Sequence, residues 1–155
     1  MGIRPAVETD LRGMLAVRAN NSISNDPDPS PGYQATMAGE TVLVADDCGI
    51  IVGFGVLRAF IRSGGIGNID ELYVLANLHD QGTGSDILKR MEEIAISRGF
   101  EWLKVYAHSP NPKDLPKLVR FYEHRGYERI QSDGMTAGVD MMKCIISQNR
   151  KHPTS

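Results

Sequence analysis

A predicted strand, a glycine-containing turn and a predicted helix follow one another between Asn68 and Gly99, and this arrangement most constrains the fold. Residues 68–75 are rich in aliphatic, aromatic and β-branched side chains, as is typical of a strand. Beyond the turn, apolar residues recur at helical spacing until Gly99 supplies a stop. These apolar positions are Ile87, Leu88, Met91, Ile94 and Ala95. Such a turn presents backbone N–H groups at a helix N-terminus, where the helix dipole favours an anion, so the sequence predicts a phosphate-binding turn.

Two common phosphate-binding motifs do not fit this turn. An ATP-binding P-loop requires a lysine after its last glycine, but Gly84 is followed by Ser85 and Asp86. A dinucleotide fingerprint requires a third small residue, and Ile87 stands at that position. The turn therefore belongs to another class of phosphate-binding motif.

Two motifs narrow that class. The run His79-Asp80-Gln81-Gly82-Thr83-Gly84 follows Leu72-Tyr73-Val74, and residues 120–127 read Arg-Phe-Tyr-Glu-His-Arg-Gly-Tyr. These runs resemble the Arg/Gln-x-x-Gly-x-Gly/Ala and Arg-Phe-Tyr-Glu-Lys-x-Gly-Phe motifs of the Gcn5-related N-acetyltransferase (GNAT) superfamily, in the same order and at about the same separation. The resemblance covers about the whole chain. It implies an α/β fold of the α+β mixed-sheet type: a mostly antiparallel sheet with one splayed parallel strand pair, flanked by about four helices.

The resemblance also implies an activity, the transfer of an acetyl group from acetyl-CoA to a primary amine. Backbone amides of the turn are expected to hold the pyrophosphate, and main-chain groups of the preceding strand to hold the pantetheine. The matched cofactor-binding residues are Leu72, Tyr73, Val74, His79, Asp80, Gln81, Gly82, Thr83, Gly84 and Ser85. His79 replaces the family's usual Arg or Gln. Leu115 stands where many relatives have an asparagine, and Asn111 is displaced from that position.

Three residues are candidates for the chemistry. The motif match assigns Tyr122 as the acid that protonates the departing thiolate; the alternative is an aromatic side chain that only packs. Asp70 and Glu71 precede the matched strand, and because side chains alternate, only one is expected to face the acceptor. A resemblance to the diamine and polyamine acetyltransferases favours Asp70 as the base. Both could instead be solvent-exposed charges, and His108 is an alternative base.

Composition sets the remaining expectations. The 155 residues suit one domain, residues 1–150, followed by a polar tail, residues 151–155. A net charge of −2 gives no reason to expect nucleic acid or a membrane as partner, and no apolar run or signal segment appears, so a cytoplasmic protein is expected. Cys48 and Cys144 form no recognisable disulfide or metal pattern, so no metal is expected. A homodimer is common in the family.

The remaining elements are predicted from periodicity and from turn residues. Predicted strands are Ile3–Val7, Thr41–Ala45, Ile50–Ala59, Trp102–Ala107, Glu128–Gln131 and Val139–Ile146. Predicted helices are one capped by Thr9 or Asp10, a short one at Gln34–Gly39, and Leu115–Arg125 ending at Gly126. Gly53 and Gly55 predict that other backbone approaches their strand closely.

Two function classes remain open from the sequence. One is an acetyltransferase acting on a small, polyamine-like amine. The other is a non-catalytic acetyl-CoA-binding regulatory or partner module on the same fold. The altered His79-Asp80 pair and the displaced Asn111 favour the second class slightly. Tyr122 and the intact Gly82-Thr83-Gly84 favour the first class more.

Overall fold

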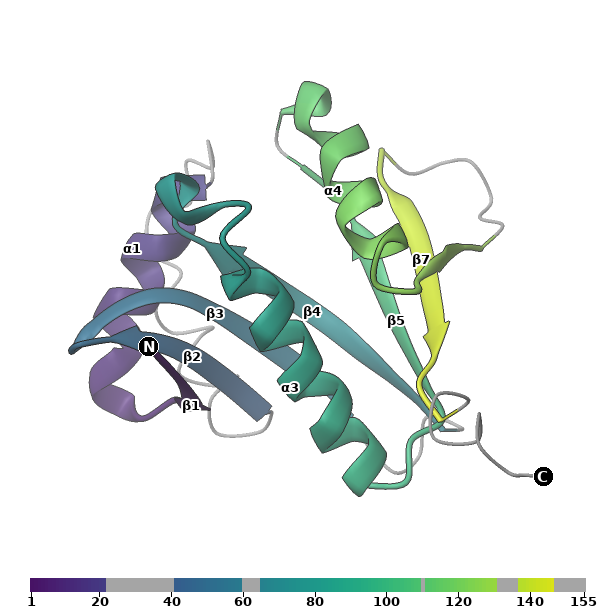
Figure 1. The fold of residues 1–155 in the computed structure, drawn as a ribbon, viewed down its shortest axis with the longest axis horizontal. Helices are drawn as coiled ribbons and strands as arrows, with labels where there is room; N and C mark the ends of the chain where they lie inside the picture. Colours follow the sequence, from purple (N-terminus) through teal and green to yellow (C-terminus); the bar gives the residue numbers. More distant parts are fainter. Residues whose placement is uncertain (22–40, 60–64, 110, 131–136, 147–155) are drawn as a thin grey trace. The chain divides into compact units, whose positions relative to one another are not determined.

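The computed structural model describes residues 1–21, 41–59, 65–109, 111–130 and 137–146 (Figure 1). Its strands are β1 (Gly2–Pro5), β2 (Thr41–Asp47), β3 (Ile50–Arg58), β4 (Ile66–Val74), β5 (Trp102–Ala107), β6 (Glu128–Arg129) and β7 (Val139–Cys144). The α-helices of the described ranges are α1 (Leu11–Asn21), α3 (Thr83–Ser97) and α4 (Leu115–Glu123). Short 3₁₀ turns are η1 (Glu8–Asp10), η2 (Ala76–Leu78) and η3 (Pro112–Asp114).

The strands form one mixed sheet, which confirms the predicted fold class. Their order is β1-β2-β3-β4-β5-β7-β6, and β4 and β5 make the parallel pair. The parallel ladder joins Ile66–Ile69 to Trp102–Val105, so the last five residues of β4 lie beyond its end. Strand β1 pairs with β2, β2 with β3, β5 with β7, and β6 with β7, each time antiparallel.

The chain divides into two compact units. Unit 1 comprises Met1–Arg58 and Asp70–Met91, and unit 2 comprises Ala59–Ile69 and Glu92–Ser155. Strand β4 and helix α3 each contribute to both units.

In unit 1, helices α1 and α3 cover opposite faces of the β2–β3 hairpin (Figure 1). The α1 face is a core of fully or nearly fully buried side chains: Met14, Val17, Val42, Val44, Phe54 and Val56. On the α3 face, a Cβ at Gly55 would lie 2.9 Å from Ile87 Cγ2, and one at Gly53 would lie 3.0 Å from the backbone oxygen of Tyr73. The predicted close approach of backbone is therefore confirmed at Gly53, whereas side chains of α3 fill the space at Gly55.

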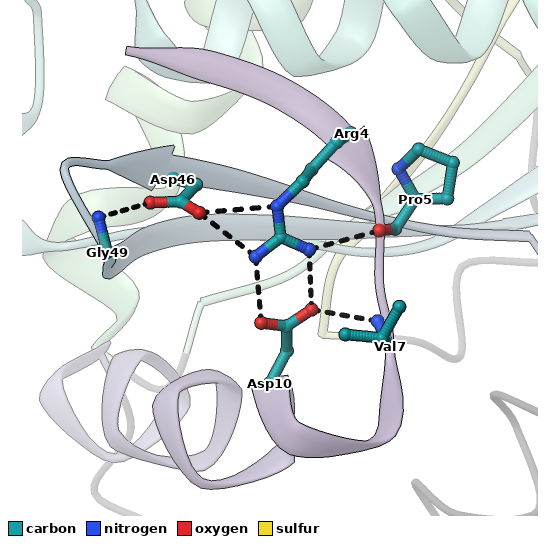
Figure 2. Close-up of polar contacts among 6 residues, drawn as sticks. All are labelled: Arg4, Pro5, Val7, Asp10, Asp46 and Gly49. Atoms are coloured by element: carbon teal, nitrogen blue, oxygen red, sulfur yellow. Dashed lines mark hydrogen bonds and ion pairs between the residues drawn. The ribbon is translucent and has the colours of Figure 1, made fainter.

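Hydrogen bonds of the Arg4 side chain link strand β1 to the β2–β3 hairpin (Figure 2). Its guanidinium donates to both carboxylate oxygens of Asp10, at 2.7 and 2.9 Å, and to Asp46 at 3.0 and 3.2 Å. Asp10 also accepts from the Val7 N–H, and Asp46 accepts from the Gly49 N–H in the hairpin turn. The Arg4 hydrogen bond lowers the pKa of Asp10, while the Gly49 amide and then Arg4 lower the pKa of Asp46. Asp10 therefore accepts hydrogen bonds from Arg4 of β1 and from Val7 at the start of η1, and Arg4 extends this network to Asp46 of β2.

In unit 2, a buried polar cluster lies between helix α3, strand β7 and the turn after α4. Lys143 donates to both carboxylate oxygens of Glu92, at 3.0 and 3.1 Å, and the Tyr127 hydroxyl donates to Glu92 at 2.9 Å. Burial first, and then the charge and hydrogen bond of Glu92, raise the pKa of Tyr127 well above its ordinary value.

Most predicted elements are present with shifted ends. Strand β5 has the predicted bounds, and Gly126, at φ +92°, follows α4 as expected of a C-terminal stop. Strand β4 begins at Ile66, earlier than predicted, because Ile66–Ile69 pair with β5. The predicted helix at Gln34–Gly39 and the tail at 151–155 lie outside the described residues. Within the described ranges, no helix combines the length and apolar character needed to cross a membrane.

Candidate active site

The predicted phosphate-binding turn links strand β4 to helix α3 in unit 1. Strand β4 ends at Val74, η2 follows, and α3 begins at Thr83. Two residues of the turn adopt left-handed backbone conformations, Asp80 at φ +69° and Gly82 at φ +89°. Glycine adopts this conformation without a Cβ penalty, and aspartate tolerates it better than most residues. Alternating right- and left-handed residues turn successive N–H groups toward one side, which is the geometry of an anion-binding concavity.

The start of α3 supplies the amides. The Asp86 N–H donates to the Gly82 carbonyl at 2.9 Å, which closes the first helical turn. By helix geometry, the N–H groups of Thr83 and Gly84, the first two residues of α3, have no acceptor inside the helix. The Gln81 N–H donates to the Leu78 carbonyl at 3.4 Å and helps to shape the turn. The geometry therefore fits an anion such as a pyrophosphate, with the first-turn amides of α3 as the main donors.

The strand end that precedes the turn is held by hydrogen bonds. The Val74 carbonyl accepts from Asn21 Nδ2 at 2.7 Å and from His79 Nε2 at 2.9 Å. The Leu75 N–H donates to the Val52 carbonyl at 2.9 Å. Because a carbonyl oxygen has two lone pairs, the Val74 carbonyl is saturated within the chain. If the main chain of Val74 binds pantetheine, it therefore does so through its N–H.

Tyr73 directs its side chain to the α1 side of the sheet. Its ring lies 5.5 Å from that of Phe54, and it packs against the core beneath α1. Burial raises the pKa of Tyr73, the charge of Glu71 raises it further, and Arg18 opposes both. The half-buried Glu71 carboxylate is therefore close enough to Tyr73 to affect its pKa.

Asp70 forms an ion pair with Arg58 of the neighbouring strand β3. The guanidinium Nη2 lies 2.8 Å from Asp70 Oδ2, and both side chains are partly exposed. Arg58 could not be predicted as the partner of Asp70, because no spacing rule links a strand-end arginine to a carboxylate in the next strand. A partly exposed ion pair lowers the net charge at this position without removing the carboxylate.

Tyr122 belongs to unit 2, where it lies on helix α4 and is 4% exposed. Its ring meets those of Phe121 and Tyr127 edge-on, at centroid distances of 5.0 and 5.5 Å. Unit 1 contains the other predicted site residues, which are Asp70, Glu71, Leu72–Val74 and the turn. The role of Tyr122 as the acid stays a prediction.

Comparison with known proteins decides the family. A family model described as an acetyltransferase (GNAT) domain matches residues 38–129, which is more than half of the chain. The chain belongs to the GNAT acetyltransferase family. The match includes the predicted phosphate-binding turn and the helix that carries Tyr122.

Solved GNAT structures share the fold. An aminoglycoside 6'-acetyltransferase type Ii superposes with a TM-score of 0.77 at 18% identity, covering 94% of this chain and 98% of that one. The PaiA N-acetyltransferase of Thermoplasma acidophilum, in complex with coenzyme A, gives 0.75 at 18% identity, covering 93% and 99%. A ribosomal-protein-alanine N-acetyltransferase of Brucella melitensis gives 0.69 at 20% identity, covering 93% and 99%. No curated protein matches the sequence. At these identities the likeness shows the GNAT fold alone.

Asn111, displaced from its expected position, and His108, the alternative base, each contact a neighbouring residue. Asn111 caps the turn η3, where its side chain accepts from the Lys113 N–H at 3.1 Å. The His108 ring stacks on the Tyr106 ring at a centroid distance of 5.8 Å, at the end of β5. Neither contact assigns a catalytic role.

Gly84→Val should abolish or strongly weaken binding of CoA while leaving the protein folded. Gly84 is the second residue of α3, and a branched side chain there would obstruct close approach of a phosphate to the helix amides. Isothermal calorimetry with CoA measures the loss. Ser97→Val, an exposed position in the last turn of the same helix, is the matched control. Equal affinity in Gly84→Val and wild type would contradict the assignment of the turn.

Proposed function

We propose that this chain is an N-acetyltransferase that transfers the acetyl group of acetyl-CoA to a primary amine on a small, polyamine-like cation, by direct attack in a ternary complex. The observation that carries the proposal is the turn with Asp80 and Gly82 at positive φ, leading into the N-terminus of α3 in a GNAT chain. When bound, acetyl-CoA supplies a thioester already activated toward amines. The first-turn amides of α3 would hold its pyrophosphate, and strand β4 its pantetheine.

The residues of this chain would manage the protons. An ammonium ion cannot attack a carbonyl, so the acceptor must lose a proton to a base or to a water chain leading to one. Asp70 or Glu71 would serve in unit 1, and Tyr122 would protonate the leaving thiolate. A phenol suits that role because its ordinary pKa, about 10, is close to that of a thiol, about 8.5. A backbone N–H of β4 would stabilise the developing negative charge on the carbonyl oxygen.

The acidic pair supports a cationic acceptor. Asp70 and Glu71 place two carboxylates on β4, the strand that would hold the pantetheine and its thioester. Arg58 balances Asp70, so the attraction for a cation would depend on both acidic side chains and would weaken with salt. Among the structural relatives, one is named for an aminoglycoside and another for a ribosomal-protein alanine, so the GNAT fold by itself does not select the acceptor.

Release of free thiol from acetyl-CoA over a panel of polyamines, aminoglycosides, amino acids and peptides tests the proposal. Turnover with a small cationic amine is expected. Binding of CoA without release over the whole panel would favour a non-catalytic acetyl-CoA-binding module. We further propose a cytoplasmic homodimer that has neither nucleic acid nor a membrane as partner.

Asp70→Asn should distinguish a base from a steering charge. If Asp70 accepts the proton, the variant should lose rate at neutral pH and regain it as pH rises and free amine becomes available. If Asp70 only attracts the acceptor, the variant should mainly raise the KM of the amine. The measurement is a pH–rate profile with the best amine of the panel, and Asp47→Asn, which changes an exposed carboxylate at the end of β2, is the control. Superimposable profiles for wild type and Asp70→Asn would assign the proton transfer to another group.

A further inference from the structure

The end of helix α1 is joined to the end of strand β4 by side-chain amides. Asn21 Nδ2 donates to the Val17 carbonyl at 3.0 Å and to the Val74 carbonyl at 2.7 Å. The neighbouring Asn20 acts in the opposite sense, since its Oδ1 accepts from the Ala76 N–H at 2.8 Å. Two adjacent asparagines thus contact the backbone immediately before the turn, one as donor and one as acceptor.

The Val74 carbonyl accepts a second hydrogen bond besides the one from Asn21. His79, inside the turn, donates its Nε2–H to the same oxygen at 2.9 Å. The oxygen therefore ties three segments together: the end of α1, the end of β4 and the beginning of the turn. Asn21 and Val74 are 53 residues apart in sequence, so this is a tertiary contact that a local turn does not require.

We propose that Asn21 and His79 are positioning residues for acetyl-CoA, acting through the Val74 carbonyl to hold the turn in the conformation that presents its amides. The inference rests on the proposed function, because it requires the turn to bind acetyl-CoA. Donors aimed at a phosphate contribute most when they are fixed before the ligand arrives. Two hydrogen bonds to one carbonyl fix the point from which the turn departs.

This role also accounts for the substitution at the first position of the GNAT motif. His79 stands where the family usually has Arg or Gln. All three side chains carry N–H donors, whereas they differ in charge and shape. A requirement for a donor to the strand-end carbonyl is therefore met by His79, even though the motif residue has changed.

The adjacent asparagines provide a matched pair of variants. Asn21→Asp replaces the amide donor by a carboxylate that faces two carbonyl oxygens. Asn20→Asp keeps an acceptor for the Ala76 N–H. Both changes place the same charge at the C-terminal end of α1, so any cost from the helix dipole is common to them. Their difference reports the loss of the Asn21 amide donor, which serves both the Val17 and the Val74 carbonyls.

We expect Asn21→Asp to raise the Kd of CoA and the KM of acetyl-CoA about tenfold, the effect of losing one hydrogen bond to the Val74 carbonyl while His79 keeps the other. The KM of the amine should stay within about twofold of wild type, and Asn20→Asp should bind CoA like wild type. Calorimetry with CoA and steady-state kinetics give these values. Melting temperature without ligand shows whether both variants are folded. A purely structural role would lower the melting temperature without separating the two KM values.

Variants of His79 give a second test, which can be used even if Asn21→Asp does not fold. His79 is exposed, and His79→Gln keeps a donor whereas His79→Leu does not. The glutamine variant should lose less affinity for CoA than the leucine variant. Equal losses in these two variants, or equal affinities in Asn21→Asp and Asn20→Asp, would overturn the positioning role. A wild-type protein that does not bind CoA at all would overturn the proposed function as well.

Discussion

Tyr122→Phe should lower kcat by about 10²–10⁴-fold, the range that general acid catalysis typically contributes. The substitution removes only the hydroxyl. The ring would keep its edge-on contacts with Phe121 and Tyr127, so the free energy of unfolding should change little. The KM of acetyl-CoA should also stay close to wild type, because the proposed pyrophosphate donors are backbone amides of α3, which the substitution does not change. Steady-state kinetics together with denaturant unfolding provide both measurements.

A matched control is the removal of another tyrosine hydroxyl from unit 2. Tyr106 is exposed on β5, and its hydroxyl accepts from the Gly138 N–H at 2.7 Å. Tyr106→Phe should leave kcat nearly unchanged. Full activity in Tyr122→Phe would show that Tyr122 only packs, which is the alternative that the sequence left open. Equal losses in both variants would indicate a general effect on unit 2.

Local patterns predicted the elements that carry the site. The strand, turn and helix from β4 to α3 depend on residues close in sequence, and backbone conformations at Asp80 and Gly82 agree with the predicted anion-binding turn. Strand β5 was predicted with its observed bounds because its buried and exposed residues alternate clearly. The start of β4 was predicted less well, since its first residues are recruited by pairing with β5, a contact the local sequence does not reveal.

The polar contacts of the site could not be read from the sequence. Arg58 reaches Asp70 from a neighbouring strand, and Asn21 reaches Val74 from the end of α1. Both contacts are set by tertiary packing. An asparagine at the end of a helix is also an ordinary helix-terminating residue, so its sequence position did not single it out.

The buried ion pair of unit 2 could not be predicted from the sequence either. Glu92 lies one helical turn after Leu88 in α3, and Lys143 lies two residues after the buried Met141 in β7, on the same face of the strand. Each residue alone looks like a charge on a surface. Only the packing of α3 against β7 within unit 2 brings the two together at 3.0 Å.

Lys143→Met should lower the free energy of unfolding by about 3–5 kcal/mol, the usual cost of removing one partner of a buried ion pair. The side chains of Lys143 and Glu92 are 8% and 12% exposed, so water cannot readily replace the lost ammonium group. Methionine matches the length of the lysine stem, which packs beside Gly126, so the loss should come from the unpaired carboxylate. Denaturant unfolding measures the change.

The matched comparison removes the whole polar cluster. In Glu92→Met/Lys143→Met/Tyr127→Phe no buried charge or hydroxyl is left without its partner, and replacement of a buried ion pair by apolar residues of similar volume is often neutral or stabilising. The triple variant should therefore be more stable than Lys143→Met alone, although it carries more substitutions. This order of stability separates the cost of an orphaned carboxylate from the loss of packing, since packing losses would accumulate with each change. A triple variant less stable than Lys143→Met would show that shape complementarity dominates in this part of unit 2. An unchanged stability in Lys143→Met would show that the Glu92 carboxylate is solvated.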